Sequence, residues 1–159
     1  MKTLIVYASK YGFTKECVDI LSNNLNGSTD IYDLREEKNI DLSKYDKVII
    51  GGSVYMGMIR KEVKKFCEEN LNLLKLKKLG LFICCMREGK EAEEDLKMSF
   101  PKDLYNTAAV KDYFGGAFIF RKMNFMDSFI VKKVAKTNKD TKNIFEDKIK
   151  SFAVKMNNL

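Results

Sequence analysis

Short strand-like runs alternate along this chain with segments of helical periodicity, and this alternation limits the folds available to it. The runs are 4–8, 28–34, 47–51, 79–84 and 114–120, most of them apolar and rich in β-branched residues. Apolar residues recur at helical spacing in 17–25, 60–74 and 145–156, and a charged helix is predicted over 90–98. Strands separated by crossover helices form parallel sheets that are covered on both faces. The sequence therefore predicts an α/β fold with three layers around a doubly wound, five-stranded parallel sheet.

The length predicts one domain over residues 1–159, long enough to bury a core. No apolar run reaches membrane-spanning length, and Met1 and Lys2 lead directly into the first strand, which leaves no room for a signal peptide. We therefore expect a cytoplasmic protein. The net charge of +7 favours an anionic partner or surface, although charges of both signs are spread along the chain.

The chain contains no histidine, which excludes Ser-His-Asp and Cys-His catalysis and any metal site with a histidine ligand. Its four cysteines, Cys17, Cys67, Cys84 and Cys85, lack the spacing of zinc ligands and fall in predicted helices and strands. We interpret them as reduced structural residues, and we expect no catalytic side chain and no metal.

The first candidate site is the turn between the first strand and the first helix. Backbone N–H groups converge in such a turn, hydroxyls add donors, and the helix N-terminus contributes a positive dipole. The spacing differs from the Walker loop and from the three-glycine dinucleotide motif. The turn predicts a phosphate cradle, with an ordinary βα turn as the alternative. Its residues are Ser9, Lys10, Tyr11, Gly12, Phe13 and Thr14.

The second candidate site follows the third strand. Gly51 and Gly52 are expected to let the backbone approach a ligand closely, and Tyr55 offers a flat ring for stacking. The alternative is a plain loop with a surface tyrosine. In a doubly wound sheet, ligands bind beyond the carboxyl ends of the strands where the strand order reverses, so two such loops together favour a ligand. The candidate residues here are Ser53, Val54, Tyr55, Met56 and Gly57.

With these motifs the chain resembles the flavodoxin-like family, and most closely the branch that includes menaquinone-dependent protoporphyrinogen oxidases. The resemblance rests on residues 7–9 with Gly12 and Thr14, on 45–55, and on 114–117. It implies the strand order 2-1-3-4-5 and FMN as cofactor. By position, residues 9–14 would hold the phosphate and residues 53–57 would line the ring. The loop beside the pyrimidine edge would comprise Cys85, Met86, Arg87 and Gly89.

The resemblance implies an FMN-binding redox protein that transfers electrons through the flavin to a partner protein or a quinone. The alternative is a quinone-dependent protoporphyrinogen oxidase-type flavoenzyme at the membrane surface. The chain has no tryptophan, so Tyr55 is expected to be the one ring platform. Arg60, Lys61 and Arg87 make the predicted site basic. Cations favour the anionic form of a neighbouring group, so we expect a less negative flavin potential than in acidic flavodoxins.

Residues 121–136 form a basic amphipathic segment, with apolar pairs at helical spacing and lysines between them. Residues 121–159 carry ten Lys or Arg against four Asp or Glu. Such a helix either lies on an anionic membrane surface or packs its apolar stripe against the sheet edge. An apolar helix face is ordinary, which favours packing against the sheet edge, while similar segments in the protoporphyrinogen oxidase branch keep a peripheral membrane contact as the alternative.

Two other classes share parts of these features. A response-regulator receiver needs an acidic pair after the first strand and an aspartate that ends the third. Ala8-Ser9 and Gly51-Gly52-Ser53 occupy those positions and exclude it. Nucleic-acid binding is suggested by charge alone, without a recognised motif, so we expect no nucleic-acid partner.

Overall fold

The structure is a computed structural model that describes residues 1–118, 123, 125–134 and 140–159. Its central sheet runs β2-β1-β3-β5-β6, and all neighbours on this path are parallel. Counted by these five strands alone, the order is 2-1-3-4-5, which confirms the predicted fold class. The short strand β4 (Met58–Ile59) pairs antiparallel with the end of β3. The five strands are β1 (Lys2–Ala8), β2 (Ser28–Asp33), β3 (Lys47–Tyr55), β5 (Lys78–Cys84) and β6 (Val110–Tyr113).

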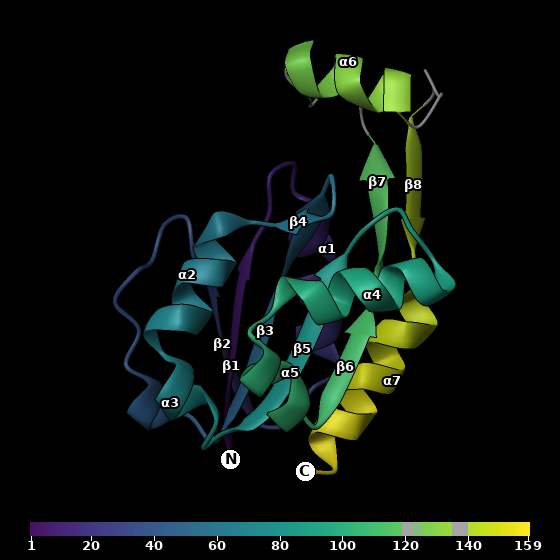
Figure 1. Cartoon of the computed structure of the whole chain (residues 1–159). Helices are drawn as coiled ribbons and strands as arrows, with labels where there is room; N and C mark the ends of the chain where they lie inside the picture. Colours follow the sequence, from purple (N-terminus) through teal and green to yellow (C-terminus); the bar gives the residue numbers. More distant parts are fainter. Residues whose placement is uncertain (119–122, 124, 135–139) are drawn as a thin grey trace.

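Helices cover both faces of this sheet (Figure 1). On one face lie α1 (Phe13–Asn23) and α7 (Glu146–Asn157), which contact each other. The opposite face carries α2 (Lys61–Glu69), α3 (Leu71–Leu74), α4 (Gly89–Ser99) and α5 (Lys102–Thr107). A 3-10 turn, Leu42–Lys44, precedes β3. The single helix expected over 60–74 is divided into α2 and α3, which meet at Asn70. Helix α4 ends at Ser99, just before Phe100-Pro101, as predicted.

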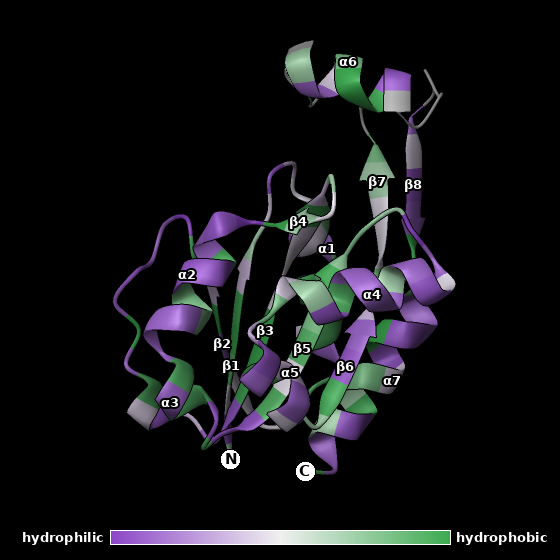
Figure 2. Ribbon diagram, viewed as in Figure 1, coloured by the Kyte–Doolittle hydropathy of each residue, from purple (hydrophilic) through white to green (hydrophobic). Residues whose placement is uncertain are grey.

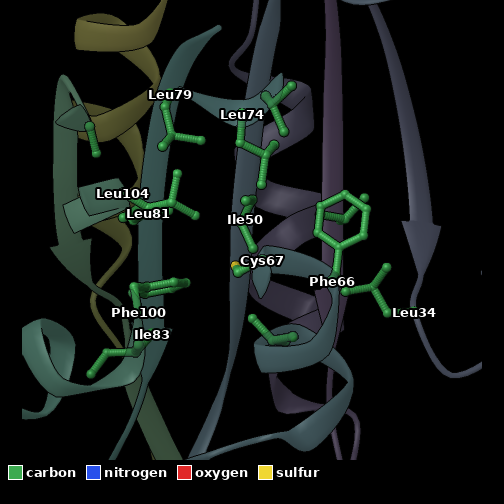
Figure 3. Packing of buried hydrophobic residues seen from close by; sticks show 14 of the residues in the cluster. Leu34, Ile50, Phe66, Cys67, Leu74, Leu79, Leu81, Ile83, Phe100 and Leu104 are labelled. Atoms are coloured by element: carbon green, nitrogen blue, oxygen red, sulfur yellow. The ribbon is translucent and has the colours of Figure 1, made fainter. Parts of the chain in front are cut away.

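The strands build two apolar cores because successive side chains point to opposite faces of a sheet. Leu4 and Val6 pack in the cluster under α2 and α4, whereas Ile5 and Tyr7 pack in the cluster under α1 and α7. Figure 2 shows much green on the inner strands β1, β3 and β5 and purple segments on the outer helices. Figure 3 shows the first cluster from close by, including Phe66 and Ile50.

The second cluster contains a group of aromatic rings that explains why position 51 is a glycine. The rings of Phe82 and Phe114 stack with their centroids 4.6 Å apart, and the ring of Phe152 meets Phe114 edge-on at 5.3 Å. A Cβ on Gly51 would lie 2.0 Å from the Phe82 ring. The expectation that Gly51 allows close approach of a ligand is therefore wrong, because the space beside it is filled by Phe82.

The predicted fifth strand, 114–120, is also misplaced. The sheet strand is β6, and the chain then leaves the sheet at Gly115, whose φ of +94° favours glycine. β7 (Gly115–Phe118) pairs antiparallel with β8 (Thr141–Ile144), and together these form a separate two-stranded arm. Phe114 nevertheless points back into the core and is fully buried. Residues 119–120 lie outside the described residues.

Helix α6 (Phe125–Val134) lies above the carboxyl ends of the strands, beyond the arm (Figure 1). Its Asp127 and Val131 are buried, whereas Met126 and Phe129 are 65% and 56% exposed. The expectation that the apolar stripe packs on the sheet edge is therefore wrong for Met126 and Phe129. Residues 121–122, 124 and 135–136 of the predicted segment lie outside the described residues. None of the helices in the described part of the chain is both long and apolar enough to span a membrane.

Candidate functional site

The first predicted loop connects β1 to α1 at the carboxyl edge of the sheet. Gly12 precedes the helix with a φ of +92°, and its backbone N–H donates to Ser9 Oγ over 3.0 Å. A left-handed residue at this position turns the chain sharply from strand to helix. No side chain caps the first turn of α1, so its N–H groups face outward with the positive end of the helix dipole. Thr14 is fully buried beneath this turn.

The second predicted loop is the tight turn between β3 and β4. Tyr55 pairs with Met58, and the turn between them holds Met56 at a φ of 54° and Gly57 at 74°. Met56 and Met58 are 59% and 74% exposed. Ser53 Oγ is buried and has no hydrogen-bond partner within the described part of the chain. A buried hydroxyl without a partner is costly, so Ser53 Oγ is available to a ligand atom or a water molecule.

The third predicted loop follows β5. Burial raises the pKa of the Cys85 thiol to about 11, so this thiol is neutral at pH 7. A Cβ on Gly116 of the arm would lie 2.7 Å from the Cys85 carbonyl oxygen, so only glycine lets the two backbones approach this closely. Gly89 adopts a φ of +59°, and its N–H donates to the Tyr113 hydroxyl over 3.2 Å.

Two adjoining cavities lie where these loops meet. The smaller cavity, about 70 Å³, touches all three loops and includes Ser9, Lys10, Tyr11, Phe13 and Ser53. The larger cavity, about 490 Å³, lies between the second and third loops. Tyr55 and Cys85 line both. The structure thus brings together most of the predicted residues; those that line neither cavity are Gly12, Thr14 and Gly89.

Several residues that line the cavities were not predicted as site residues from the sequence. Phe118 of β7 lines both cavities, so Tyr55 is not the one aromatic ring available. Asp95 of α4, Val131 of α6 and Thr141 of β8 complete the larger cavity. The motif at 114–117 is recognisable in the sequence. Because it was expected in the central sheet, the position of Phe118 in the cavity wall was not predicted.

The larger cavity carries a pair of opposite charges. Arg87 Nη1 lies 3.6 Å from Asp95 Oδ1, and the Asp95 side chain is 11% exposed against 55% for Arg87. Arg60, also expected to make the site basic, pairs with Glu62 at 3.4 Å. The predicted cations are therefore partly balanced by carboxylates.

The first loop also carries charge. The Lys10 ammonium lies 5.5 Å from the centre of the Tyr55 ring, and Lys10 and Tyr11 both donate to the Asp127 carboxylate. Burial opposes ionisation of Asp127, but these donors outweigh it and hold its pKa below the ordinary range. Burial, followed by the negative charge of Asp127, raises the pKa of the Tyr55 hydroxyl. The donors of Lys10 and Tyr11 are therefore engaged by a carboxylate of the chain itself.

A known protein family matches the chain over most of its length. The family model described as a flavodoxin domain matches residues 4–144. No curated protein sequence matches the chain.

Solved structures that resemble the chain include flavodoxin 1 from Bacillus cereus. The two share 14% identity with a TM-score of 0.55, over 98% of this chain and 97% of that one. The Fusobacterium nucleatum flavodoxin bound to flavin mononucleotide shares 11% identity at a TM-score of 0.54, over 99% and 97%. Rubredoxin oxygen:oxidoreductase from Desulfovibrio gigas shares 12% identity at a TM-score of 0.62; 99% of this chain matches, but only 35% of that protein. At these identities the likeness concerns the fold.

Proposed function

This chain belongs to the flavodoxin-domain family, and from that premise we propose that it is a redox protein that binds FMN at the carboxyl edge of its sheet and transfers electrons through it. The observation that carries the proposal is the convergence, on one pair of cavities, of a loop whose donors hold a carboxylate and of two aromatic rings, Tyr55 and Phe118, that line both cavities. This edge is where doubly wound sheets of this strand order bind their ligands.

The residues present fit the cofactor in three respects. The first loop offers the donors of Lys10 and Tyr11 and the N-terminus of α1 to a phosphate. Tyr55 and Phe118 offer ring faces to a planar group. Ser53 Oγ is a buried hydroxyl that a ligand atom can partner. No histidine is needed, because the chain only binds and orients.

Bound FMN would supply reversible one- and two-electron transfer, which the side chains here do not provide. The protein's part is to hold the phosphate at residues 9–14, to line the ring with residues 53–57, and to place residues 85–89 beside the pyrimidine edge. Val54 and Met86 are apolar residues of both cavity walls and exclude water from the ring. The exposed side chain of Met56 lies at the wall of the larger cavity, where a redox partner would approach.

The test is the visible absorption spectrum of the purified full chain, mixed with FMN and then freed of unbound flavin. We expect flavin bands that stay with the protein and are released as FMN on denaturation. Tyr55→Leu should retain less FMN because it loses one ring face, whereas Tyr105→Leu, a change far from the cavities, should retain as much as the wild type. A protein that remains colourless in excess FMN contradicts the proposal.

A second candidate is a flavoenzyme of the quinone-dependent protoporphyrinogen oxidase type, acting at a membrane surface. The observation that favours it is the outer face of α6, where exposed Met126 and Phe129 lie beside the exposed Lys132 and Lys133. Apolar side chains flanked by lysines match an anionic lipid surface in both hydrophobicity and charge.

Flotation with vesicles that contain an anionic phospholipid tests this contact. The double variant Met126→Ser, Phe129→Ser should lose most of the vesicle-bound fraction, because it removes the side chains that would insert. The control is Leu73→Ser, Leu76→Ser, which removes two other exposed apolar side chains from the opposite end of the molecule. Equal binding by both double variants and the wild type excludes α6 as the contact.

A further inference from the structure

Helix α6 places a carboxylate inside the loop that is expected to hold the phosphate. Asp127 Oδ2 accepts hydrogen bonds from both Lys10 Nζ and Tyr11 Oη, residues that are more than 100 positions away in the sequence. Asp127 is only 7% exposed. Charge-assisted hydrogen bonds of this kind are among the strongest side-chain contacts. The two longest donor side chains of the loop are therefore already engaged by an internal anion.

Little free space remains around this contact while Asp127 occupies it. The cavity that Lys10 and Tyr11 line measures about 70 Å³, well below the roughly 300 Å³ at which ligand pockets begin. The neighbouring cavity of about 490 Å³ has Val131 of α6 in its wall. Asp127 and Val131 lie one turn apart on α6 and are the two buried side chains among those described for this helix. The contact between Asp127 and the loop thus also holds α6 over the larger cavity.

We propose that Asp127 is an internal competitor for the anionic group of the ligand, so that a flavin phosphate binds by displacing this carboxylate from Lys10 and Tyr11. The inference rests on the proposed function, because it concerns the same site. A phosphate monoester brings nearly two negative charges and three acceptor oxygens, against one charge and two oxygens for a carboxylate. It therefore replaces Asp127 on the same donors, whereas a flavin without phosphate leaves Asp127 in place.

The consequence is that Asp127 determines how strongly the site distinguishes phosphorylated from unphosphorylated flavin. While Asp127 occupies the loop, only a fraction of the protein is ready to accept a phosphate, and the apparent affinity falls by that fraction. Removal of the negative charge frees the donors for FMN and gives riboflavin no such advantage. Displacement of Asp127 also removes one of the two buried contacts of α6, so FMN binding loosens this helix.

The experiment compares the dissociation constants of FMN and riboflavin, measured by flavin fluorescence, for the wild type, Asp127→Asn and Glu68→Gln. Glu68 is an exposed carboxylate of α2, so its substitution changes the net charge equally without touching the loop. We expect Asp127→Asn to bind FMN about tenfold more tightly, the scale of one hydrogen bond to a charged group, with riboflavin affinity unchanged. Glu68→Gln should bind both flavins as the wild type does.

Amide hydrogen exchange over residues 125–134 gives a second readout that needs no redox activity. FMN, or inorganic phosphate alone at a higher concentration, should speed exchange in α6 of the wild type and change it less in Asp127→Asn, whose uncharged amide holds the two donors less tightly. Equal FMN affinity in wild type and Asp127→Asn, equal tightening for riboflavin, or an α6 that does not respond to phosphate overturns the inference. If no variant binds FMN, the proposed function fails, and the phosphate arm alone then decides the role of Asp127.

Discussion

Arg87 and Asp95 bring opposite charges to the wall of the larger cavity, and the two differ in exposure. Asp95 is nearly buried, whereas more than half of the Arg87 side chain is in contact with solvent. Solvent screens an exposed charge more strongly than a buried one. The charge of Asp95 is therefore screened less than that of Arg87, one of the three cations expected from the sequence to make the site basic.

These two residues should move the midpoint potential of bound flavin in opposite directions. Asp95→Asn leaves Arg87 unopposed, favours the anionic reduced cofactor, and should make the potential less negative by tens of millivolts, on the order expected for one charge at short range. Arg87→Gln should make it more negative by a smaller amount. A spectroelectrochemical titration measures both, with Glu68→Gln as the control. Shifts of the same sign in both variants contradict this electrostatic account.

At the scale of single residues, the candidate loops were predictable from the sequence because their signals are local. Ser9 and Gly12 lie three positions apart, between an apolar run and a helix, and they meet as that spacing implies. The partner of Lys10 was not predictable, because Asp127 is the one acidic residue in a basic segment and lies 117 positions away. Sequence spacing carries no information about a contact between two segments that are placed by the whole fold.

At the scale of elements, the alternation of strand and helix patterns predicts a five-stranded parallel sheet, and the resemblance to the flavodoxin-like family implies the strand order. The structure confirms both. The error at 114–120 has a physical cause. Phe114 is as apolar as a core strand residue and is buried like one, but the positive φ of Gly115 turns the chain away from the sheet. Glycine occurs both at strand ends and in turns, so hydrophobicity alone placed the strand four residues too late.

The arm that this turn creates is the element on which the site depends most. β7 brings Phe118 to both cavities, and β8 brings Thr141 to the larger one. The close approach of Gly116 to the Cys85 carbonyl fixes the base of the arm against the third loop. The arm thus adds the Phe118 ring to the Tyr55 ring, so the absence of tryptophan does not leave the two cavities with a single aromatic face.

At the scale of the whole molecule, the net charge of +7 destabilises the folded state through repulsion, so the stability of the fold depends on its ionised carboxylates. Asp33, at the carboxyl end of β2, illustrates this. Its Oδ2 accepts from Arg35 Nη2 over 2.7 Å, and its Oδ1 accepts from the Arg35 backbone N–H over 2.9 Å. Burial opposes ionisation of Asp33, but the hydrogen bonds from Arg35 outweigh it and lower its pKa. The pKa of Asp127 is lowered in the same sense.

The sign of the resulting pH dependence follows from linkage. A carboxyl with a lower pKa in the folded state stabilises the protein fully above its unfolded pKa of about 3.9, and this stabilisation is lost as the pH falls through the folded pKa. Asp33→Asn should therefore lower the free energy of unfolding at pH 7 by about 1 kcal/mol, a value reduced for the exposure of Arg35. The difference from the wild type should shrink steadily below about pH 4.

Urea unfolding of the wild type, Asp33→Asn and Glu68→Gln between pH 7 and pH 3 measures this dependence. All three proteins should lose stability in acid, because protonation of carboxylates raises an already positive net charge. Only the gap between the wild type and Asp33→Asn should close, since the amide that replaces the carboxylate has no charge to lose in acid. A gap that stays constant with pH would show that Asp33 acts through its hydrogen-bond geometry alone, and that the charge of the Asp33–Arg35 pair contributes nothing to the stability of this basic molecule.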